Sequence, residues 1–197
     1  GVNSTIPIAA AAALGLPLVD ADGMGRAFPE LQMVLPTLSG VTASPLAFSD
    51  EKGNTGVLQT ADNSWTERIA RVACVEMGCS VMISGFSMTG VEARESLVAG
   101  SLSRCIAIGQ RIAEAREAKT DPVAAVVDLL GGRELFGGKV ADVNRATTTG
   151  FARGRARIDG DGGASLTLQF QNEHLVAEAD GRVLATTPDL IMVLDGE

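Results

Sequence analysis

The pattern of the sequence changes at Gly131 and Gly132, and this change constrains the fold more than any other feature of the chain. Before it, apolar residues recur every three or four positions, as in helices, between short apolar runs that resemble strands. After it, Arg, Thr, Val and Gly alternate in strand-length segments separated by turn sequences such as "DGDGG" and "ADGR". We therefore expect the C-terminal part of a layered α/β domain with a mixed sheet over residues 1–132, and an all-β, barrel-like domain over residues 133–197.

The first stretch of the chain predicts a helix, a strand and a second helix in succession. A helix over residues 3–14 can be capped by an Asn or Ser side chain, and Gly15 ends it. The apolar run over residues 16–19 is too continuous for a half-exposed strand, so we expect a buried one. Residues 20–25 form a turn, and Pro29, followed by a glutamate, resembles the first turn of the next helix.

Later segments carry similar local signals. In the first part we expect a hairpin over 45–60, a helix capped by Ser64, a strand over 79–86, a helix capped by Thr89, an amphipathic helix over 101–118 and a helix that begins at Asp121. In the second part the strand-length segments are 136–147, 150–160, 164–179, 182–188 and 189–195.

The charge and hydropathy of the chain exclude several classes of protein. A formal net charge of −8 leaves no basic surface for nucleic acid or anionic lipid, whose phosphates would repel it. No apolar run reaches the roughly 20 residues of a membrane helix, and no signal-peptide pattern opens the chain. Cys74, Cys79 and Cys105 favour reduced thiols, and the first two also fit a nucleophile or ligand pair. We expect a cytoplasmic enzyme or oligomer subunit.

Charge and glycine gather in the segment "DADGMGRAFPE" that follows the first predicted strand. In open α/β sheets, ligands bind outside the carboxyl ends of strands, where loops meet helix N-termini. Asp20 and Asp22 flank one residue, so in extended backbone they point to the same side and can bind a divalent metal ion or act as acid and base. Gly23 and Gly25 permit a sharp turn, and Arg26 can hold an anion.

The same residues also fit a structural role. An aspartate after a strand is commonly a helix cap or a turn former, and an Asp–Arg pair often only fixes a loop. Spacing does not decide between the catalytic and the structural interpretation, so both stay open here.

The second part of the chain holds fewer polar signals. His174 is the only histidine, which excludes a multi-histidine zinc site within the chain. Glu173 and His174 are adjacent in a predicted strand and therefore face opposite ways. Arg153, Arg155 and Arg157 alternate on one strand face, which fits either anion binding or a solvated surface.

Segments spread over nearly the whole chain carry a resemblance to a known family. They are "GVNSTIPIAAAAALGLPLVDADGMGRAFPELQM", "ERIARVACVEMG", "FGGKVADVNRATTTGF", "FQNEHLVA" and "TTPDLIMVLD". Together they resemble the S-methyl-thiohydantoin desulfurase-like family, which is associated with hydantoinase and oxoprolinase proteins. The resemblance implies an α/β domain followed by a barrel-like domain in a longer protein, so we expect this chain to be a fragment that is truncated at its end.

The resemblance also implies an activity, the removal of sulfur from a thiohydantoin or related cyclic imide by water. On this hypothesis Asp20 and Asp22 act as base or bind a divalent metal ion, Arg26 holds negative charge, and Glu30 orients Arg26. The residues expected to contact the substrate are Asn3, Gly25, Glu30, Asn172 and Glu173. The alternative is a non-catalytic accessory or regulatory partner of hydantoinase or oxoprolinase proteins. A homo-oligomer fits either function.

Overall fold

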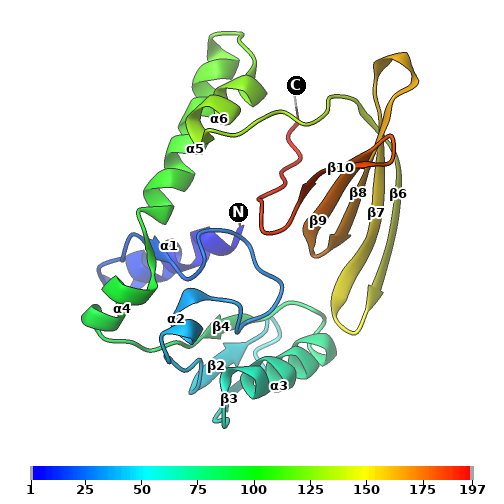
Figure 1. The fold of residues 1–197 in the computed structure, drawn as a ribbon. Helices are drawn as coiled ribbons and strands as arrows, with labels where there is room; N and C mark the ends of the chain where they lie inside the picture. The colour runs from blue at the N-terminus through cyan, green and yellow to red at the C-terminus, as the bar shows by residue number, and fades with distance from the viewer. Residues whose placement is uncertain (1, 196–197) are drawn as a thin grey trace.

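A computed structural model describes residues 2–195 of the chain, with side chains from Thr5 onward (Figure 1). The helices are α1 (Val2–Leu14), α2 (Leu35–Leu38), α3 (Asn63–Glu76), α4 (Gly90–Ser96), α5 (Ser101–Glu117), α6 (Pro122–Leu130) and a short 3-10 turn, η1 (Asp161–Gly163). The strands are β1 (Ala21–Asp22), β2 (Leu46–Ser49), β3 (Thr55–Leu58), β4 (Met82–Ser84), β5 (Val98–Ala99), β6 (Lys139–Thr148), β7 (Phe151–Asp159), β8 (Ser165–Gln171), β9 (Glu173–Ala179) and β10 (Arg182–Thr186).

The first part of the chain consists of helices and two small sheets. In one sheet β2 lies between β3 and β4, and in the other β1 pairs with β5. Figure 1 shows α3 beside the three-stranded sheet at the bottom of the view. We expected a mixed sheet, but every strand pair among the described residues of this part is antiparallel. The short β2–β3 hairpin, which the sequence predicts, allows only an antiparallel pair.

Helix ends with strong local signals lie where the sequence predicts them. Thr89 and Glu92 form a complete capping box at the start of α4, where Thr89 N donates to Glu92 Oε2 at 2.7 Å. At the start of α6, the Asp121 side chain accepts from Val123 N at 2.8 Å. Gly15 follows the end of α1 with a φ of 65°, which suits a helix C-terminus.

The cap of α3 differs from the prediction by two residues. Asp62, rather than Ser64, accepts the N–H of Trp65, at 2.8 Å, and the helix therefore begins at Asn63. The Asn63 side chain is buried and accepts the N–H of Ala43 at 2.7 Å. A contact distant in the sequence thus fixes how α3 begins.

Two predictions for the segment before α2 are wrong. Residues 16–19 form no strand, because Leu16 and Val19 are 58% and 64% exposed, and the proline between them has no N–H for a strand partner. No helix begins at Pro29 either, because the backbone there is held by side chains of α3. The next helix, α2, begins six residues later at Leu35.

The second part is a five-stranded antiparallel sheet in the order β10-β9-β8-β7-β6, as expected for the β-rich segment. Its core is formed by Leu166 and Leu168 of β8, Ala177 of β9 and Ile191. These side chains lie on one face, since residues two apart on a strand point the same way. The opposite face of β7 and β8 carries the alternating polar side chains.

A closed barrel is not found among the described residues. Within them β6 pairs only with β7, and β10 pairs only with β9, so the sheet is open at both edges. Residues 189–195, which we predicted to be a strand, form none. Instead this segment lies against the core face, where Ile191 is buried and its carbonyl oxygen lies 3.0 Å from His174 Nδ1.

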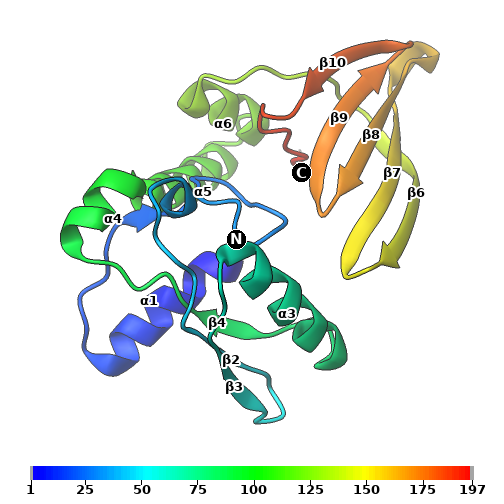
Figure 2. The same cartoon turned by 60° about the horizontal axis from the view of Figure 1, so that its bottom comes forward.

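The arrangement of the two parts is open, as Figures 1 and 2 show. The accessible surface is 12779 Å², whereas a compact monomer of this mass would expose about 8,800 Å². None of the helices in the described part of the chain has the length and apolar character needed to cross a bilayer. Ligand sites form preferentially where parts of a protein meet, so we expect a site at the contacts between the two parts.

Candidate functional site

The aspartate loop, residues 20–30, meets one end of the five-stranded sheet. That end carries the sheet tips, which we define as residues 148–151, 171–173 and 186–188. Because neighbouring strands are antiparallel, all three tips lie at the same end. In Figures 1 and 2 the β6–β7 tip approaches α3. We call the contacts among the aspartate loop, α3 and the sheet tips the junction.

Arg71 on α3 holds three parts of the junction together. Its Nε donates to Glu67, one helical turn earlier. Its Nη2 donates to Pro29 O at 2.9 Å, and its Nη1 donates to Gly150 O at 3.2 Å. The guanidinium carbon also lies 4.3 Å from the centroid of the Phe151 ring. Gly150 has a φ of 79°, and a Cβ there would approach the Arg71 side chain to 3.1 Å, so the tip depends on glycine.

Glu67 completes this arrangement from the buried side. Its Oε1 accepts from Arg71, and its Oε2 accepts the N–H of Leu31 at 2.8 Å. Glu67 is only 7% exposed, and a buried carboxylate is stable only with such partners. The end of the aspartate loop is therefore fixed to α3 by charged side chains.

Arg26 links the aspartate loop to another sheet tip. Its Nη1 donates to Pro188 O at 2.6 Å. We predicted that Glu30 orients Arg26, but Glu30 accepts instead from Gln32 Nε2 at 2.6 Å, and no ion pair joins Glu30 to Arg26 among the described residues. Gly25 has a φ of 75°, and its Cα packs against Val98 of β5, where a Cβ would come within 3.2 Å.

Asp22 shapes the turn of the aspartate loop. Its Oδ1 accepts the N–H groups of Met24, at 2.7 Å, and of Gly25, at 2.5 Å, which is an Asx turn. Its Oδ2 makes no hydrogen bond among the described residues. One carboxylate oxygen of Asp22 is thus free for chemistry while the other fixes the side chain.

Asp20 caps α5, which begins 81 residues later in the chain, at Ser101. Its Oδ1 accepts from Leu102 N at 2.8 Å and Ser103 N at 3.1 Å, and its Oδ2 accepts from Ser103 Oγ at 2.6 Å. Gly100, which precedes α5, has no side chain to serve as a cap, so Asp20 takes that place. These hydrogen bonds, first that of the Ser103 hydroxyl, lower the pKa of Asp20.

Replacing Asp20 with alanine is expected to lower the Tm at neutral pH and to lower it less in acid. The folded pKa of Asp20 lies below its ordinary value of 3.8. The carboxylate therefore stabilises the fold above that pH, and this contribution is lost as the pH falls through the folded pKa. Thermal unfolding at neutral pH and at about pH 3 measures the difference.

The control for this measurement is Asp161→Ala, which removes an aspartate whose carboxylate makes no hydrogen bond among the described residues. Its effect on Tm should be small at both pH values. An equal loss of Tm at both pH values for Asp20→Ala would contradict the capping role.

Of the other residues predicted to contact the substrate, two lie at a sheet tip and one lies on α1. Asn172, at a sheet tip, has a φ of 55°, and its Oδ1 accepts the N–H of Ala152 at 2.8 Å. Glu173 begins β9 at the same tip. The backbone of Asn3 is part of α1, but its side chain is not among those that the structure describes. The fold thus brings Asn172 and Glu173 to the sheet end that Arg26 reaches.

Gln32 lies two residues beyond the aspartate loop and is not among the site residues that the sequence predicts. Its Oε1 is buried and has no hydrogen-bond partner among the described residues. The amide orientation is fixed because its Nε2 donates to Glu30, and the opposite orientation would place two oxygens together. A buried acceptor without a donor is unfavourable, so a ligand donor would satisfy it.

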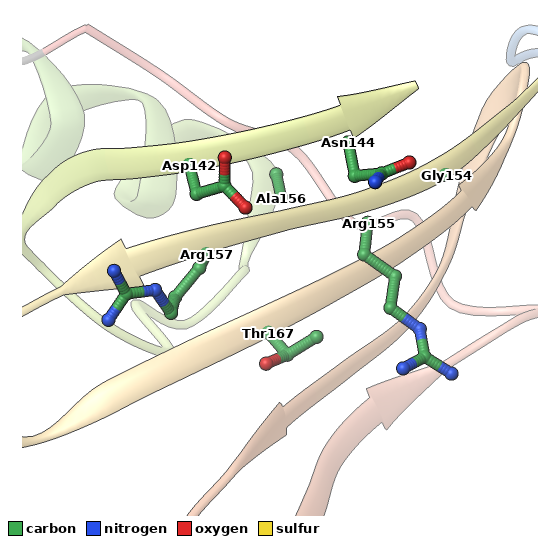
Figure 3. A pocket seen from close by; sticks show the side chains of 7 residues that line it. All are labelled: Asp142, Asn144, Gly154, Arg155, Ala156, Arg157 and Thr167. Atoms are coloured by element: carbon green, nitrogen blue, oxygen red, sulfur yellow. The ribbon is translucent and has the colours of Figure 1, made fainter. Parts of the chain in front are cut away.

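Two cavities lie on the sheet. One, of about 470 Å³, lies on the polar face and is shown in Figure 3, where Arg155 and Arg157 extend away from each other; its lining is Asp142, Asn144, Gly154, Arg155, Ala156, Arg157 and Thr167. The other, of about 1040 Å³, is an apolar groove between the core face, α6 and residues 190–195. Neither is lined by Asp20, Asp22 or Arg26.

Comparison with protein families identifies the chain. Residues 1–60 match the N-terminal domain of the S-Me-THD-like family, and residues 61–197 match its C-terminal domain. The chain belongs to the S-methyl-thiohydantoin desulfurase-like family. The resemblance is therefore confirmed over the whole chain.

The two family domains meet at the junction. The aspartate loop lies in the N-terminal family domain, whereas α3 and the sheet tips lie in the C-terminal one. Arg26 and Arg71 therefore make hydrogen bonds between the two domains. The boundary that we placed near Gly132 stays a prediction.

A solved structure also resembles this chain. It is the X-ray crystal structure of a protein from Chromobacterium violaceum, with 27% sequence identity and a TM-score of 0.72. The match covers 91% of this chain and 49% of that chain, so this chain spans about half the length of that protein. No curated protein matches the chain.

Glu67 and Arg71 are also absent from the site residues that the sequence predicts. Their spacing of four in "TERIAR" is a helical ion-pair signal. That signal predicts a surface pair on one helix. It does not predict that the pair reaches a loop 36 residues earlier and a tip 79 residues later.

Proposed function

We propose that this chain takes part in the hydrolytic desulfuration of a thiohydantoin or related cyclic imide, and that the aspartate loop is the site. The observation that carries the proposal is the match to both domains of the desulfurase-like family. The junction supports the location, because a loop rich in charge and glycine from one family domain meets the sheet tips of the other there.

The reaction replaces sulfur by oxygen on one ring carbon. The water oxygen bonds to the ring carbon that bears sulfur, a base takes the proton of the water, and a tetrahedral intermediate forms. The carbon–sulfur bond then breaks with its electron pair on sulfur, and the departing sulfide or thiol takes a proton. The site must supply a base, a donor for the developing negative charge and an acid.

The aspartate loop offers groups for these tasks. Asp22 is the proposed base, because its Oδ2 accepts no hydrogen bond from the described part of the chain and its Oδ1 is held by the N–H groups of Met24 and Gly25. Arg26 is the proposed donor to negative charge, because within residues 2–195 its side chain uses Nη1 alone, which donates to Pro188 O. Outside the aspartate loop, the buried Gln32 Oε1 has no described partner and is proposed to accept a ring N–H of the thiohydantoin.

Asp20 is a positioning residue in this proposal. All of its hydrogen bonds go to the start of α5, and its lowered pKa makes it a weak base. It holds the beginning of the aspartate loop, as Glu67 and Arg71 hold the end. A fixed loop keeps Asp22 in one orientation, which catalysis requires.

The described residues do not fit the divalent metal site that we predicted at Asp20 and Asp22. Both oxygens of Asp20 accept hydrogen bonds, so the pair offers one free carboxylate oxygen, on Asp22. Hard cations take several oxygen ligands. Residues 2–195 hold no group of three or more His, Cys, Asp or Glu side chains that could hold a metal ion. The proposed reaction therefore uses no step through a metal ion.

The accessory role remains a second candidate function. The observation that favours it is that Asp20 and Asp22 accept hydrogen bonds that the loop and α5 need for their own structure. On this alternative the aspartate loop is structural, and the chain is a non-catalytic partner of a hydantoinase or oxoprolinase protein.

A turnover assay separates the two functions. The protein at its natural length is incubated with an S-methylated thiohydantoin, and the hydantoin formed is measured by chromatography. We expect hydantoin to appear at a rate proportional to protein concentration and to continue after treatment with a chelator. No hydantoin from folded protein, together with a stoichiometric complex with a hydantoinase protein, would support the accessory role instead.

A further inference from the structure

Cys74 and Cys79 lie at the C-terminal end of α3, where the chain reverses over the helix. The reversal uses positive φ angles at Gly78, 97°, and Cys79, 67°. In it the N–H of Cys79 donates to the carbonyl oxygen of Cys74 at 2.7 Å. This is a helix-ending hydrogen bond of the Schellman type, and it holds the backbone of Cys79 against the last turn of α3.

This hydrogen bond limits the separation of the two Cα atoms. With standard backbone dimensions, two Cα atoms joined through a 2.7 Å N–H···O contact lie at most about 6.6 Å apart. Disulfides span Cα separations of roughly 4.4 to 6.8 Å. The backbone therefore keeps the Cα atoms of Cys74 and Cys79 below the largest separation that a disulfide spans.

The thiols themselves are available for such a bond. Both are free; Cys79 is exposed, and Cys74 is partly buried. Burial, and after it the negative charge of the Cys79 thiolate, raises the pKa of Cys74. The exposed thiol is the one that meets a reagent first.

We propose that Cys74 and Cys79 are a redox site that forms a reversible disulfide with a small disulfide such as oxidised glutathione. The Cys79 thiolate attacks one glutathione sulfur, forms a mixed disulfide and releases one glutathione thiolate. Cys74 then loses its proton and attacks the Cys79 sulfur, which forms the Cys74–Cys79 bond and releases the second glutathione thiolate. Two cysteine thiols are oxidised and one glutathione disulfide is reduced to two thiols.

The site is adjacent to the junction on the same helix. Cys74 follows Arg71 by three residues, so their side chains lie on neighbouring positions of one face of α3. The disulfide would join the last turn of α3 to the residues that follow it. One turn earlier on the same helix, Arg71 donates to the aspartate loop and to a sheet tip.

Peptide mapping tests the proposal directly. Trypsin cleaves after Arg71 and Arg94 and nowhere between, so residues 72–94 form one peptide with both cysteines, and Cys105 falls in another peptide. The folded protein is incubated with excess glutathione disulfide, blocked with iodoacetamide and digested without reductant. We expect the 72–94 peptide to be unalkylated and about 2 Da lighter than its reduced form, and to revert with dithiothreitol.

Two variants serve as controls. Cys105→Ser should form the same disulfide as the natural chain, whereas Cys74→Ser should retain glutathione on Cys79. A natural chain whose 72–94 peptide is doubly alkylated, or carries glutathione on Cys79 as the Cys74→Ser variant does, would overturn the proposal. The readout is a mass, so it does not depend on whether the chain turns over a thiohydantoin.

Discussion

Replacing Arg71 with alanine is expected to lower the free energy of unfolding by about 3 kcal/mol, because the change removes one partner of a buried ion pair. Glu67 would stay buried with the Leu31 N–H as its only described partner. The carbonyl oxygens of Pro29 and Gly150 would lose their donor as well. Urea unfolding at neutral pH, followed by circular dichroism, measures the change.

Two variants on α3, one at Arg68 and one at Arg71 itself, serve as references for Arg71→Ala. Arg68 is exposed, and its main contact is the Trp65 ring at 5.2 Å, so Arg68→Ala should cost about 0.5 kcal/mol. Arg71→Lys keeps a positive charge beside Glu67 but cannot donate to three acceptors, so its loss should be intermediate. A cost of Arg71→Ala no larger than that of Arg68→Ala would contradict the proposed role of the junction.

Elements whose determinants lie close together in the sequence could be predicted. The capping box of Thr89 and Glu92 spans four residues, and the Asp121 cap and the β2–β3 hairpin are equally local. The antiparallel strands of the second part also follow from alternation and turn sequences. In these segments local preference and tertiary structure agree, so sequence patterns suffice.

The segment before α2 could not be predicted, because distant residues decide its conformation. Pro29 looks like the first residue of a helix, but Arg71 holds its carbonyl oxygen. The apolar run over residues 16–19 looks buried, but no strand pairs with it. Local propensity is a weak guide wherever such contacts override it.

The sequence could name candidate residues of the site, but it could not predict which residues they contact. Spacing placed Asp20, Asp22 and Arg26 in one turn, but Ala21 and Asp22 form the short strand β1, which pairs with β5. It could not show that Asp20 caps α5 or that Arg26 reaches Pro188, which is 162 residues away. The structural interpretation of both aspartates, a cap and a turn former, matches the hydrogen bonds observed.

Asp22→Asn is expected to lower kcat for hydantoin formation by about 100-fold or more, the usual contribution of a general base. An asparagine still has an oxygen that can accept from Met24 and Gly25, so the Asx turn and the stability of the fold should be kept. The substitution therefore removes the negative charge and the basicity of one side chain without removing its structural role.

Asp50 provides a matched control for that substitution. Like Asp22 it forms an Asx turn, with its Oδ1 accepting from Lys52 N at 2.9 Å and Asn54 N at 2.8 Å, but it lies in the β2–β3 hairpin. The decisive measurement is kcat for hydantoin formation by the natural protein, Asp22→Asn and Asp50→Asn, each shown to be folded. The proposed function predicts that only Asp22→Asn loses turnover; equal turnover in all three would contradict it.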